Sequence, residues 1–396
     1  MGSGGGFVDF DNDGWLDVVL VDCRPLPGGK RDGTPGARLY RNNRDRTFTD
    51  VTRGSGLDKL SLYGMGIAAA DYDGDGKTDL YISGVLDGGR LLRNTGGFRF
   101  TDATARAGVA NPGGWGTSCA WLDYDKDGKL DLFVANYVKY RTLADDQPCF
   151  AGDSQKRIYC IPSAYEGTSC RLYRNRGDGT FSDETDASGI GASKGKSLGV
   201  TVWDIDGDGW SDIFVANDTT PGYLFHNQKN GKFQEIGVEA GVAYSDSGIP
   251  HSGMGIDTGD VLNNGKTALL ITNYYGQETN LYHQVDTLLF EDKRMDAGVA
   301  APTNQMVGFG VLFVDTDNDG LLDIFQMSGH VQDDVSEREP KATFKQPALL
   351  LHNRGNAVFD EVGLKSGEPF STPRVGRGAA AGDFDNDGRV DLLITE

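Results

Sequence analysis

Residues 9–17 of this chain have the sequence DFDNDGWLD, with aspartates at the first, third, fifth and ninth positions and a glycine at the sixth. This pattern, Asp-x-Asp-x-Asp-Gly-x-x-Asp, occurs five more times in complete form, at residues 71–79, 123–131, 204–212, 315–323 and 383–391. A seventh copy, DVLNNGKTA at residues 260–268, has lost three of its acids. The copies start 52 to 81 residues apart, and such spacing is typical of a repeat architecture.

The chemistry of the motif indicates a cation site. Carboxylates at alternate positions followed by a glycine let a short segment wrap around a hard cation, and the glycine supplies the positive φ of the sharp turn. We expect the four aspartates of each complete copy and the backbone carbonyl of its seventh residue to bind Ca²⁺, giving about six sites. The expected ligands are Asp9, Asp11, Asp13, Trp15 and Asp17; Asp71, Asp73, Asp75, Lys77 and Asp79; Asp123, Asp125, Asp127, Lys129 and Asp131; Asp204, Asp206, Asp208, Trp210 and Asp212; Asp315, Asp317, Asp319, Leu321 and Asp323; and Asp383, Asp385, Asp387, Arg389 and Asp391.

Other interpretations of the motif fit less well. Solvated acidic turns would explain one copy, because Asp-Gly is a common turn signal, but not six copies with the same four aspartates. An EF-hand loop would carry an acid at its twelfth position, where this chain has Leu20, Ile82, Val134, Val215, Gln326 and Ile394. The calcium repeats of a parallel β-helix recur in tandem about every nine residues. The copies in this chain start 52 to 81 residues apart, so they do not fit that fold. Calcium is favoured over magnesium because an all-protein oxygen cage suits its looser geometry. In the eroded copy, we expect Asp260 to lie in a site without metal.

The composition limits the possible partners. With 38 basic and 58 acidic residues the formal net charge is −20, which argues against nucleic acid and anionic membranes as partners. Much of the acidity lies in the loops, so bound calcium would offset more than half of it. No apolar run of about 20 residues is available to span a bilayer. The N-terminal MGSGGGFVDF lacks an export signal, and we expect a fragment of a secreted, cell-surface or periplasmic protein whose signal was removed.

The residues around each loop predict four β-strands per repeat. A Gly/Ala-rich segment such as GRGAAAGD precedes the loop, and an apolar run such as DLFVAN follows it. A segment such as LYRN and then a phenylalanine segment such as GTFSDET complete the repeat. Seven such repeats predict an all-β, seven-bladed β-propeller with the calcium loops between the first and second strands. Only two strands of the last repeat precede Glu396, so residues 1–396 are expected to form one propeller domain whose last blade is incomplete and has an exposed edge.

Five cysteines invite a disulfide prediction. Cys149 and Cys160 lie in the longest insertion, where a disulfide would pin a loop that has no core of its own. Cys23 and Cys170 lie near insertions and are either free or paired. Cys119, in an apolar run, is expected to be a small buried hydrophobe.

The loops and their flanking strands resemble the FG-GAP/VCBS repeats of integrin α-subunit heads. The LYRN segment followed by F-x-D-x-T, the tags NYV, ND and GHV after second strands, and the two-cysteine insertion that follows Asn136-Tyr137-Val138 resemble the cartilage acidic protein family with its UnbV/ASPIC-type domain. The resemblance covers nearly all 396 residues and implies a secreted or surface calcium-binding protein linked to adhesion or matrix. Three features depart from the family: no UnbV/ASPIC domain follows, the fifth loop is eroded, and the literal FG-GAP wording is absent.

A binding face is expected opposite the calcium loops. Alternating strand directions place the connections between second and third strands there, including the insertions at 22–37, 137–169 and 329–347. Loops carry binding function more often than strands do, and aromatic and amide groups suit an extracellular protein or glycan. The candidate ligand-binding residues are Asn136, Tyr137, Asn217, Asp218, Asn273, Tyr274, Tyr275 and His330. The alternative is that these side chains only cap strand ends.

No catalytic motif is present, and we expect a non-enzymatic protein. His226, His283 and His352 occupy the position of Arg41, Arg93 and Arg174 in other repeats, so a structural role is expected for them. The alternative function is a polysaccharide lyase or hydrolase on a propeller scaffold, for which His330, Asp333 and Asp334 are the only nearby set of acid and base groups.

Overall fold

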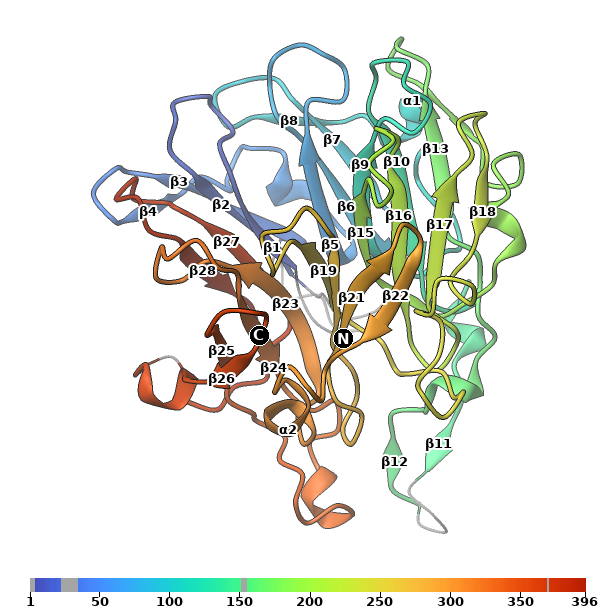
Figure 1. The fold of residues 1–396 in the computed structure, drawn as a ribbon. Helices are drawn as coiled ribbons and strands as arrows, with labels where there is room; N and C mark the ends of the chain where they lie inside the picture. Colours follow the sequence, from blue (N-terminus) through green and yellow to red (C-terminus); the bar gives the residue numbers. More distant parts are fainter. Residues whose placement is uncertain (1–3, 23–34, 151–154, 369) are drawn as a thin grey trace.

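The computed structural model describes residues 4–22, 35–150, 155–368 and 370–396. It is an all-β propeller in which sheets of consecutive antiparallel strands stand around a common axis (Figure 1). The first three blades contain β1 (Gly5–Val8), β2 (Asp17–Val21), β3 (Ala37–Asn42) and β4 (Phe48–Asp50); β5 (Tyr63–Ala70), β6 (Asp79–Val85), β7 (Arg90–Asn94) and β8 (Phe100–Asp102); and β9 (Gly116–Leu122), β10 (Asp131–Asn136), β13 (Arg171–Asn175) and β14 (Phe181–Asp183).

The next three blades have the same strand order. They contain β15 (Ser197–Trp203), β16 (Asp212–Asn217), β17 (Tyr223–Asn227) and β18 (Phe233–Glu235); β19 (Ile256–Gly259), β20 (Ala268–Ile271), β21 (Asn280–Asp286) and β22 (Leu289–Asp292); and β23 (Gly308–Val314), β24 (Asp323–Ser328), β25 (Leu349–Asn353) and β26 (Phe359–Glu361). The last repeat supplies a two-stranded sheet of β27 (Ala379–Gly382) and β28 (Asp391–Ile394), which packs between β23 and β1.

The prediction of seven blades is therefore wrong, and the structure corrects the count to six. Six repeats form a complete four-stranded blade, whereas the described residues after the sixth blade provide only β27 and β28. The motif count overestimated the blade count because each motif marks only the turn between a first and a second strand. A blade also needs the two outer strands.

Short helices lie in the connections. Two α-helical turns, α1 (Thr104–Ala107) and α2 (Ala300–Thr303), follow fourth strands. The described 3₁₀ turns are η1 (Leu57–Lys59), η2 (Leu143–Asp145), η3 (Pro162–Ala164), η4 (Ile190–Ala192), η5 (Val335–Glu337) and η6 (Gly363–Lys365). Among the residues that the structure describes, no helix has the length and apolar content needed to cross a membrane.

The hydrophobic core lies between neighbouring blades. The second strands of blades two to six are buried along their whole length, since both of their faces are covered. The first strands, which line the axis, are only partly buried and are rich in Gly and Ala where backbones approach closely, as in YGMGIAAA of β5. Radial packing of this kind explains why the apolar runs of the second strands show no inside–outside alternation.

The longest insertion contains the predicted disulfide. Cys149 and Cys160 are bonded, and they flank the small sheet of β11 (Cys149–Phe150) and β12 (Arg157–Ile158) at the bottom of Figure 1. Cys119 and Cys170 are buried free thiols, as the interpretation of Cys119 as a small hydrophobe requires. Cys23 lies outside the described residues.

A side-chain amide connects adjacent repeats at six junctions, and at five of them this side chain is buried. The amide nitrogen of Asn94 in β7 donates to the carbonyl oxygen of Phe10 in the preceding loop (2.9 Å) and to that of Thr78 in its own loop (3.0 Å). Asn42 donates in the same way to Phe384 (2.7 Å), which joins the last repeat to the first. The other junctions are made by Asn175 with Tyr72, Asn227 with Tyr124, Gln284 with Ile205, and Asn353 with Val261.

Removal of the Asn42 amide should destabilise the ring. We expect Asn42→Ala to lower the free energy of unfolding by about 1–3 kcal/mol, because it leaves buried carbonyl groups without a donor. The neighbouring Asn43 is exposed, and Asn43→Ala should cost less than about 0.5 kcal/mol. Urea unfolding of both variants measures the difference, and equal losses would contradict the inter-repeat role of Asn42.

Candidate metal centre

Each acidic loop is folded by its own carboxylates. In the first loop, Asp9 accepts hydrogen bonds from the backbone N–H of Asp13 (3.1 Å) and of Gly14 (2.9 Å). Asp13 then accepts from the N–H of Trp15 (2.9 Å). The glycine at the sixth position has the expected positive φ, 83° at Gly14. The other five complete loops repeat these bonds. The carbonyl ligand predicted at the seventh residue stays a prediction.

The aspartate at the ninth position ties the loop to the strand that follows. Asp79 is fully buried, and it accepts from the backbone N–H of Tyr72 (3.2 Å) in the loop and from that of Asn94 (2.7 Å) in β7. Burial raises the pKa of Asp79 to about 7 against these two donors, with help from the negative charge of Asp73. The pKa of the equivalent Asp131 is raised to about 7 and that of Asp17 to about 6, again chiefly by burial. A nearby cation would remove this cost of buried charge.

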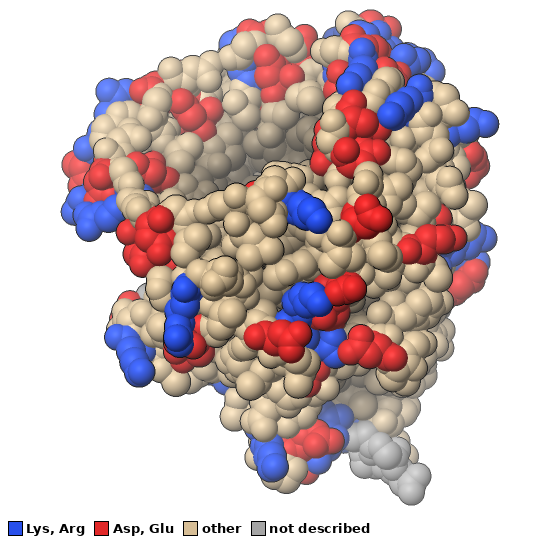
Figure 2. Space-filling view, viewed as in Figure 1, with Lys and Arg blue, Asp and Glu red and all other residues tan. Residues whose placement is uncertain are grey.

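The carboxylates converge. One ligand atom from each of Asp9, Asp11 and Asp13 lies within 4.8 Å of the others. Equivalent clusters are formed by Asp71, Asp73 and Asp79; by Asp123, Asp125 and Asp127; and by Asp204, Asp206 and Asp212. Figure 2 shows acidic side chains gathered around the hollow at the top of the molecule, with Lys and Arg side chains beside them. The structure thus brings the predicted ligands of each of these loops together.

Carboxylate oxygens at the third position have a chemistry that fits a divalent cation. In three loops, Oδ1 of the third aspartate is buried and has no hydrogen-bond partner, namely at Asp11, Asp125 and Asp385. A buried acceptor without a donor is costly, and a hard cation is the partner that an oxygen-only cluster of this kind can take. The residues present therefore fit a divalent ion.

Surface cations balance the outward-facing oxygens of these carboxylates. Arg174 pairs with Asp125 (2.5 Å) and Asp127 (3.2 Å), and Lys129 also pairs with Asp127 (2.8 Å). Although burial opposes it, hydrogen bonding and the charge of Lys129 and Arg174 hold the pKa of Asp127 below its usual value. These cations are partly exposed and sit at the rim, so they leave the inward-facing oxygens to the cluster.

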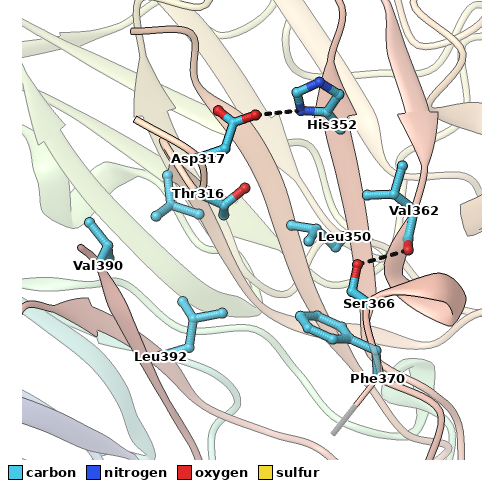
Figure 3. A pocket seen from close by; sticks show the side chains of 10 residues that line it. Thr316, Asp317, Leu350, His352, Val362, Ser366, Phe370, Val390 and Leu392 are labelled. Carbon is cyan, nitrogen blue, oxygen red and sulfur yellow. Dashed lines mark hydrogen bonds and ion pairs between the residues drawn. The ribbon is translucent and has the colours of Figure 1, made fainter. Parts of the chain in front are cut away.

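A histidine replaces the arginine in three repeats, and in two of them it contacts the ninth aspartate. His352 Nδ1 lies 3.1 Å from Asp323 and 3.8 Å from Asp317 (Figure 3), and His226 Nδ1 lies 3.0 Å from Asp212. Both imidazoles hold the ninth aspartate of their own repeat, which accords with the structural role expected for them. His283, in the repeat with the eroded loop, is half-buried instead, and burial lowers its pKa.

The eroded fifth loop keeps its shape with one of its four acids. Asp260 still accepts from the N–H of Asn264 (3.1 Å) and of Gly265 (2.6 Å). Ala268 stands where the ninth aspartate should be, and Gln284 compensates by accepting from the N–H of Thr267 (2.9 Å). Asn264 keeps the bond of the fifth aspartate by accepting from the N–H of Lys266 (2.9 Å). The turn therefore depends on the first aspartate, a side-chain oxygen at the fifth position and the glycine, and the other three acids are not needed to fold it.

The residues predicted to bind a partner lie opposite the loops, at the ends of the second strands, and many contact one another. The amides of Asn136, Asn217 and Asn273 are buried and bonded within the protein, for example from Asn136 to the carbonyl of Ser169 (3.1 Å). The hydroxyl of Tyr137 donates to Asp218 (2.7 Å), which joins the third and fourth repeats.

His330 belongs to a second group on this face. Its Nε2 lies 3.1 Å from the hydroxyl of Tyr274, its Nδ1 accepts from the N–H of Gln332 (3.0 Å), and burial lowers its pKa. Tyr275 packs against the same ring, with centroids 6.5 Å apart. Asp334 is held by Lys156 (2.8 Å) and Arg338 (2.5 Å). Asp333 takes no part in the ion pairs found among the described residues.

The family model described as FG-GAP-like repeat matches four stretches of this chain, at residues 9–82, 71–134, 152–215 and 204–271. Together they make up more than half of the chain. The chain belongs to the FG-GAP-like repeat family. The expected resemblance to the cartilage acidic protein family is also confirmed. This FG-GAP protein is 27% identical to cartilage acidic protein 1 of Homo sapiens over 346 residues, which are 84% of this chain and 47% of that protein.

Two further likenesses agree with this assignment. Cartilage acidic protein 1 of Xenopus tropicalis is 26% identical over 347 residues, 84% of this chain and 48% of that protein. The chain spans about half the length of the curated relatives it matches. A structure of an Agrocybe aegerita lectin, solved to explain its recognition of non-reducing terminal N-acetylglucosamine, superposes with a TM-score of 0.54 at 16% identity, covering 100% of this chain and 85% of the lectin. This last likeness supports the fold alone.

Sequence reasoning missed two contributors to the loops. The fourth position also has positive φ, and where it is asparagine its amide bridges to the next loop, as Asn12 does to the carbonyl of Gly76 (2.6 Å) and Asn386 to that of Gly14 (3.1 Å). The inter-repeat amide of the LYRN segment was the second. The recurrence of Asn at these positions indicates a structural role, but the sequence does not reveal the hydrogen-bond partners because they lie in another repeat.

The raised pKa of Asp79 predicts a pH dependence in calcium-free buffer. Its folded-state pKa of about 7 exceeds the ordinary value of 3.8, so the folded state binds the proton more tightly and wild-type stability falls as pH rises between these values. We compare the free energy of unfolding of the wild type with that of Asp79→Asn at pH 5 and at pH 8. Relative to the variant, the wild type should lose on the order of 1–3 kcal/mol of stability between these two pH values. Denaturant titrations with a chelator measure this difference. Asp246→Asn, at a carboxylate that is 81% exposed, should not change the pH profile. A stability difference between the wild type and Asp79→Asn that does not vary with pH would contradict the raised pKa of Asp79.

Proposed function

We propose that this protein is a calcium-stabilised extracellular propeller that binds a protein or glycan and has no enzymatic activity. The observation that carries the calcium part is the recurrent acidic cluster with a buried, partnerless carboxylate oxygen in the first, third and last loops. The FG-GAP-like repeats and the likeness to cartilage acidic protein 1 support a binding or scaffold role for this chain. The disulfide between Cys149 and Cys160 favours an oxidising compartment, and thus a secreted, cell-surface or periplasmic location.

The expected stabilisation by calcium is large. Extracellular modules bind calcium with dissociation constants of about 10⁻⁴–10⁻³ M, and a tenfold excess over such a constant contributes about 1.4 kcal/mol per site. Six sites together would contribute on the order of 8 kcal/mol, comparable to the stability of an ordinary domain. Calcium would then act by holding each loop against the strand that starts at its ninth aspartate.

The fifth loop supplies an internal control for calcium binding. We expect EDTA to lower the melting temperature of the wild type markedly, and Asp125→Asn/Asp127→Asn to reduce the calcium-induced stabilisation by about 1.4 kcal/mol, the contribution of one site. Asp260→Asn alters a loop that lacks the acids, so its calcium increment should equal that of the wild type. Calorimetry with and without calcium measures these increments. An unchanged wild-type melt in EDTA would rule out the structural role of calcium.

The insertion at residues 137–169 is the surface that best fits a protein partner. It exposes large apolar side chains of Leu143, Phe150, Tyr159 and Ile161, with Tyr159 70% and Ile161 67% exposed. Apolar side chains gathered on one exposed segment are typical of protein-binding surfaces. By contrast, the amide nitrogens of Asn136, Asn217 and Asn273, which would suit a glycan, already donate to groups within the protein, and this favours a protein over a glycan.

Two double variants test this surface. Tyr159→Ser/Ile161→Ser should weaken binding to a partner found on an array of extracellular matrix proteins by at least tenfold, the loss expected when about 1.4 kcal/mol of contact is removed. Met295→Ser/Leu364→Ser alters side chains that are 70% and 63% exposed elsewhere, and it should bind like the wild type. A parallel glycan array with a product assay covers the other outcomes: cleavage of a polysaccharide that is lost in His330→Ala would replace the proposal with the lyase or hydrolase alternative.

A further inference from the structure

The chain contains the dipeptide Asn-Gly at two places, and both are followed by lysine. Asn230-Gly231 lies in the hairpin that joins β17 to β18 (Figure 1), and Asn264-Gly265 lies in the eroded fifth loop. In this dipeptide the backbone nitrogen of glycine can attack the side-chain carbonyl carbon of asparagine, because glycine has no Cβ to obstruct the approach. The nitrogen must lose its proton to react, so the hydrogen bonding of the glycine N–H controls the reaction.

The N–H of Gly265 is held by a carboxylate. It donates to Oδ2 of Asp260 at 2.6 Å, as the glycine of each complete loop donates to the first aspartate of that loop. The charge of the carboxylate disfavours loss of the proton, since a second negative charge would form beside it. The reaction is therefore opposed at Asn264, even though Asn264 and Gly265 are both exposed.

The N–H of Gly231 has no such partner, because it forms no hydrogen bond among the residues that the structure describes. In other respects the two sites are alike. The φ angles are 77° at Gly231 and 78° at Gly265, and each asparagine Oδ1 accepts from the N–H of the lysine two residues later, at 3.1 Å from Lys232 and 2.9 Å from Lys266. Asn230 is exposed and Gly231 is half-buried, so exposure alone would favour reaction at the other site.

We propose that Asn230 is a site of spontaneous deamidation, whereas Asn264 is protected from the same reaction by Asp260. The nitrogen of Gly231, after loss of its proton, attacks Cγ of Asn230. The N–Cγ bond forms, the Cγ–Nδ2 bond breaks, and the side-chain nitrogen takes up a proton and leaves as ammonia. Water then adds to either carbonyl carbon of the cyclic imide and opens it, which gives aspartate or isoaspartate without oxidation or reduction.

The aspartyl product fits the hairpin. Aspartate is the residue at the equivalent position of the first and third repeats, where Asp45 and Asp178 accept from the N–H two residues later, at 3.1 Å and 2.9 Å. Asn230 already makes this bond through its side-chain oxygen, and an aspartate keeps that oxygen.

The isoaspartyl product does not fit, because it carries the main chain through the side-chain carbon and lengthens the turn. This turn is closed by the bond from the N–H of Gln228 to the carbonyl of Lys232 (2.9 Å). It connects Asn227 and Phe233, which both contact Tyr124 of the preceding repeat. Isoaspartate should therefore loosen the junction between the third and fourth repeats.

The deamidation rates of the two asparagines in one molecule test the proposal. The folded 396-residue protein is incubated at pH 8, and deamidation of Asn230 and Asn264 is followed by mass spectrometry of proteolytic peptides. We expect Asn230 to react at least tenfold faster, the ratio that a barrier difference of about 1.4 kcal/mol produces. In urea the protecting bond is lost, and the rates should become similar because both sites have the sequence Asn-Gly-Lys. Equal rates in the folded protein, or a difference that persists in urea, would overturn the proposal.

Two variants locate the protection. Asp260→Ala removes the acceptor of the Gly265 N–H, so deamidation of Asn264 should accelerate at least tenfold while that of Asn230 stays unchanged, and a melt verifies that the variant is folded. Asp296→Ala removes an exposed acid of the same repeat and should leave both rates unchanged. A folded Asp260→Ala variant in which Asn264 still reacts slowly would contradict the protective role of Asp260. If this variant does not fold, the comparison of folded and urea-treated wild type still decides.

Hydrogen exchange tests the effect on the hairpin. Exchange of the β17 and β18 amides should be faster in aged protein that contains isoaspartate, whereas Asn230→Asp, which reproduces the aspartyl product, should exchange like the fresh wild type. Unchanged exchange in the aged protein would contradict the loosening of the junction.

Discussion

A buried aspartate at the start of five of the second strands is the constraint on which the rest of the propeller depends. Asp17, Asp79, Asp131, Asp212 and Asp323 are almost inaccessible to water, and each accepts one N–H from its loop and one from its third strand. The asparagine that provides the second N–H also sends its side-chain amide to the preceding repeat. One carboxylate therefore couples the turn, the blade and the junction between blades.

This coupling has an electrostatic cost. Four carboxylates within a few ångströms repel one another, and burial raises the pKa of the ninth aspartate toward neutrality. Arginine and lysine side chains relieve the outward-facing oxygens, and in two repeats a histidine contacts the buried aspartate. Among the described residues, the buried Oδ1 atoms of Asp11, Asp125 and Asp385 have no hydrogen-bond partner. The fifth loop forms the same turn with Asp260 as its one acid, so the other three acids of a complete loop are not required for turning.

Much of this arrangement could be predicted from the sequence. The parts that could not be predicted were all missed for the same reason. The motif contains its own hydrogen bonds, so the loops, the strands that flank them and the positive φ at Gly14 follow from local chemistry. The disulfide followed from the isolation of Cys149 and Cys160 in one insertion. The role of Asn94, the bridge from Asn12 and the pairing of Phe10 with Phe100 join separate repeats, and no local pattern reveals such partners. The blade count was wrong because the motif marks two strands of a four-strand unit.

The exchange seen in the fifth repeat has a consequence for how the ring responds to its surroundings. Ala268 removes the charge that the other repeats bury, while Gln284, one methylene longer than asparagine, still reaches the carbonyl of Ile205 (2.7 Å). The hydrogen bond that joins the fifth repeat to the fourth is thus made by neutral groups, and it does not depend on a charged ninth residue in the fifth loop. Loosening at low divalent-ion concentration would be uneven around the circumference, with the fifth loop changing least because it has one acid where the other loops have four.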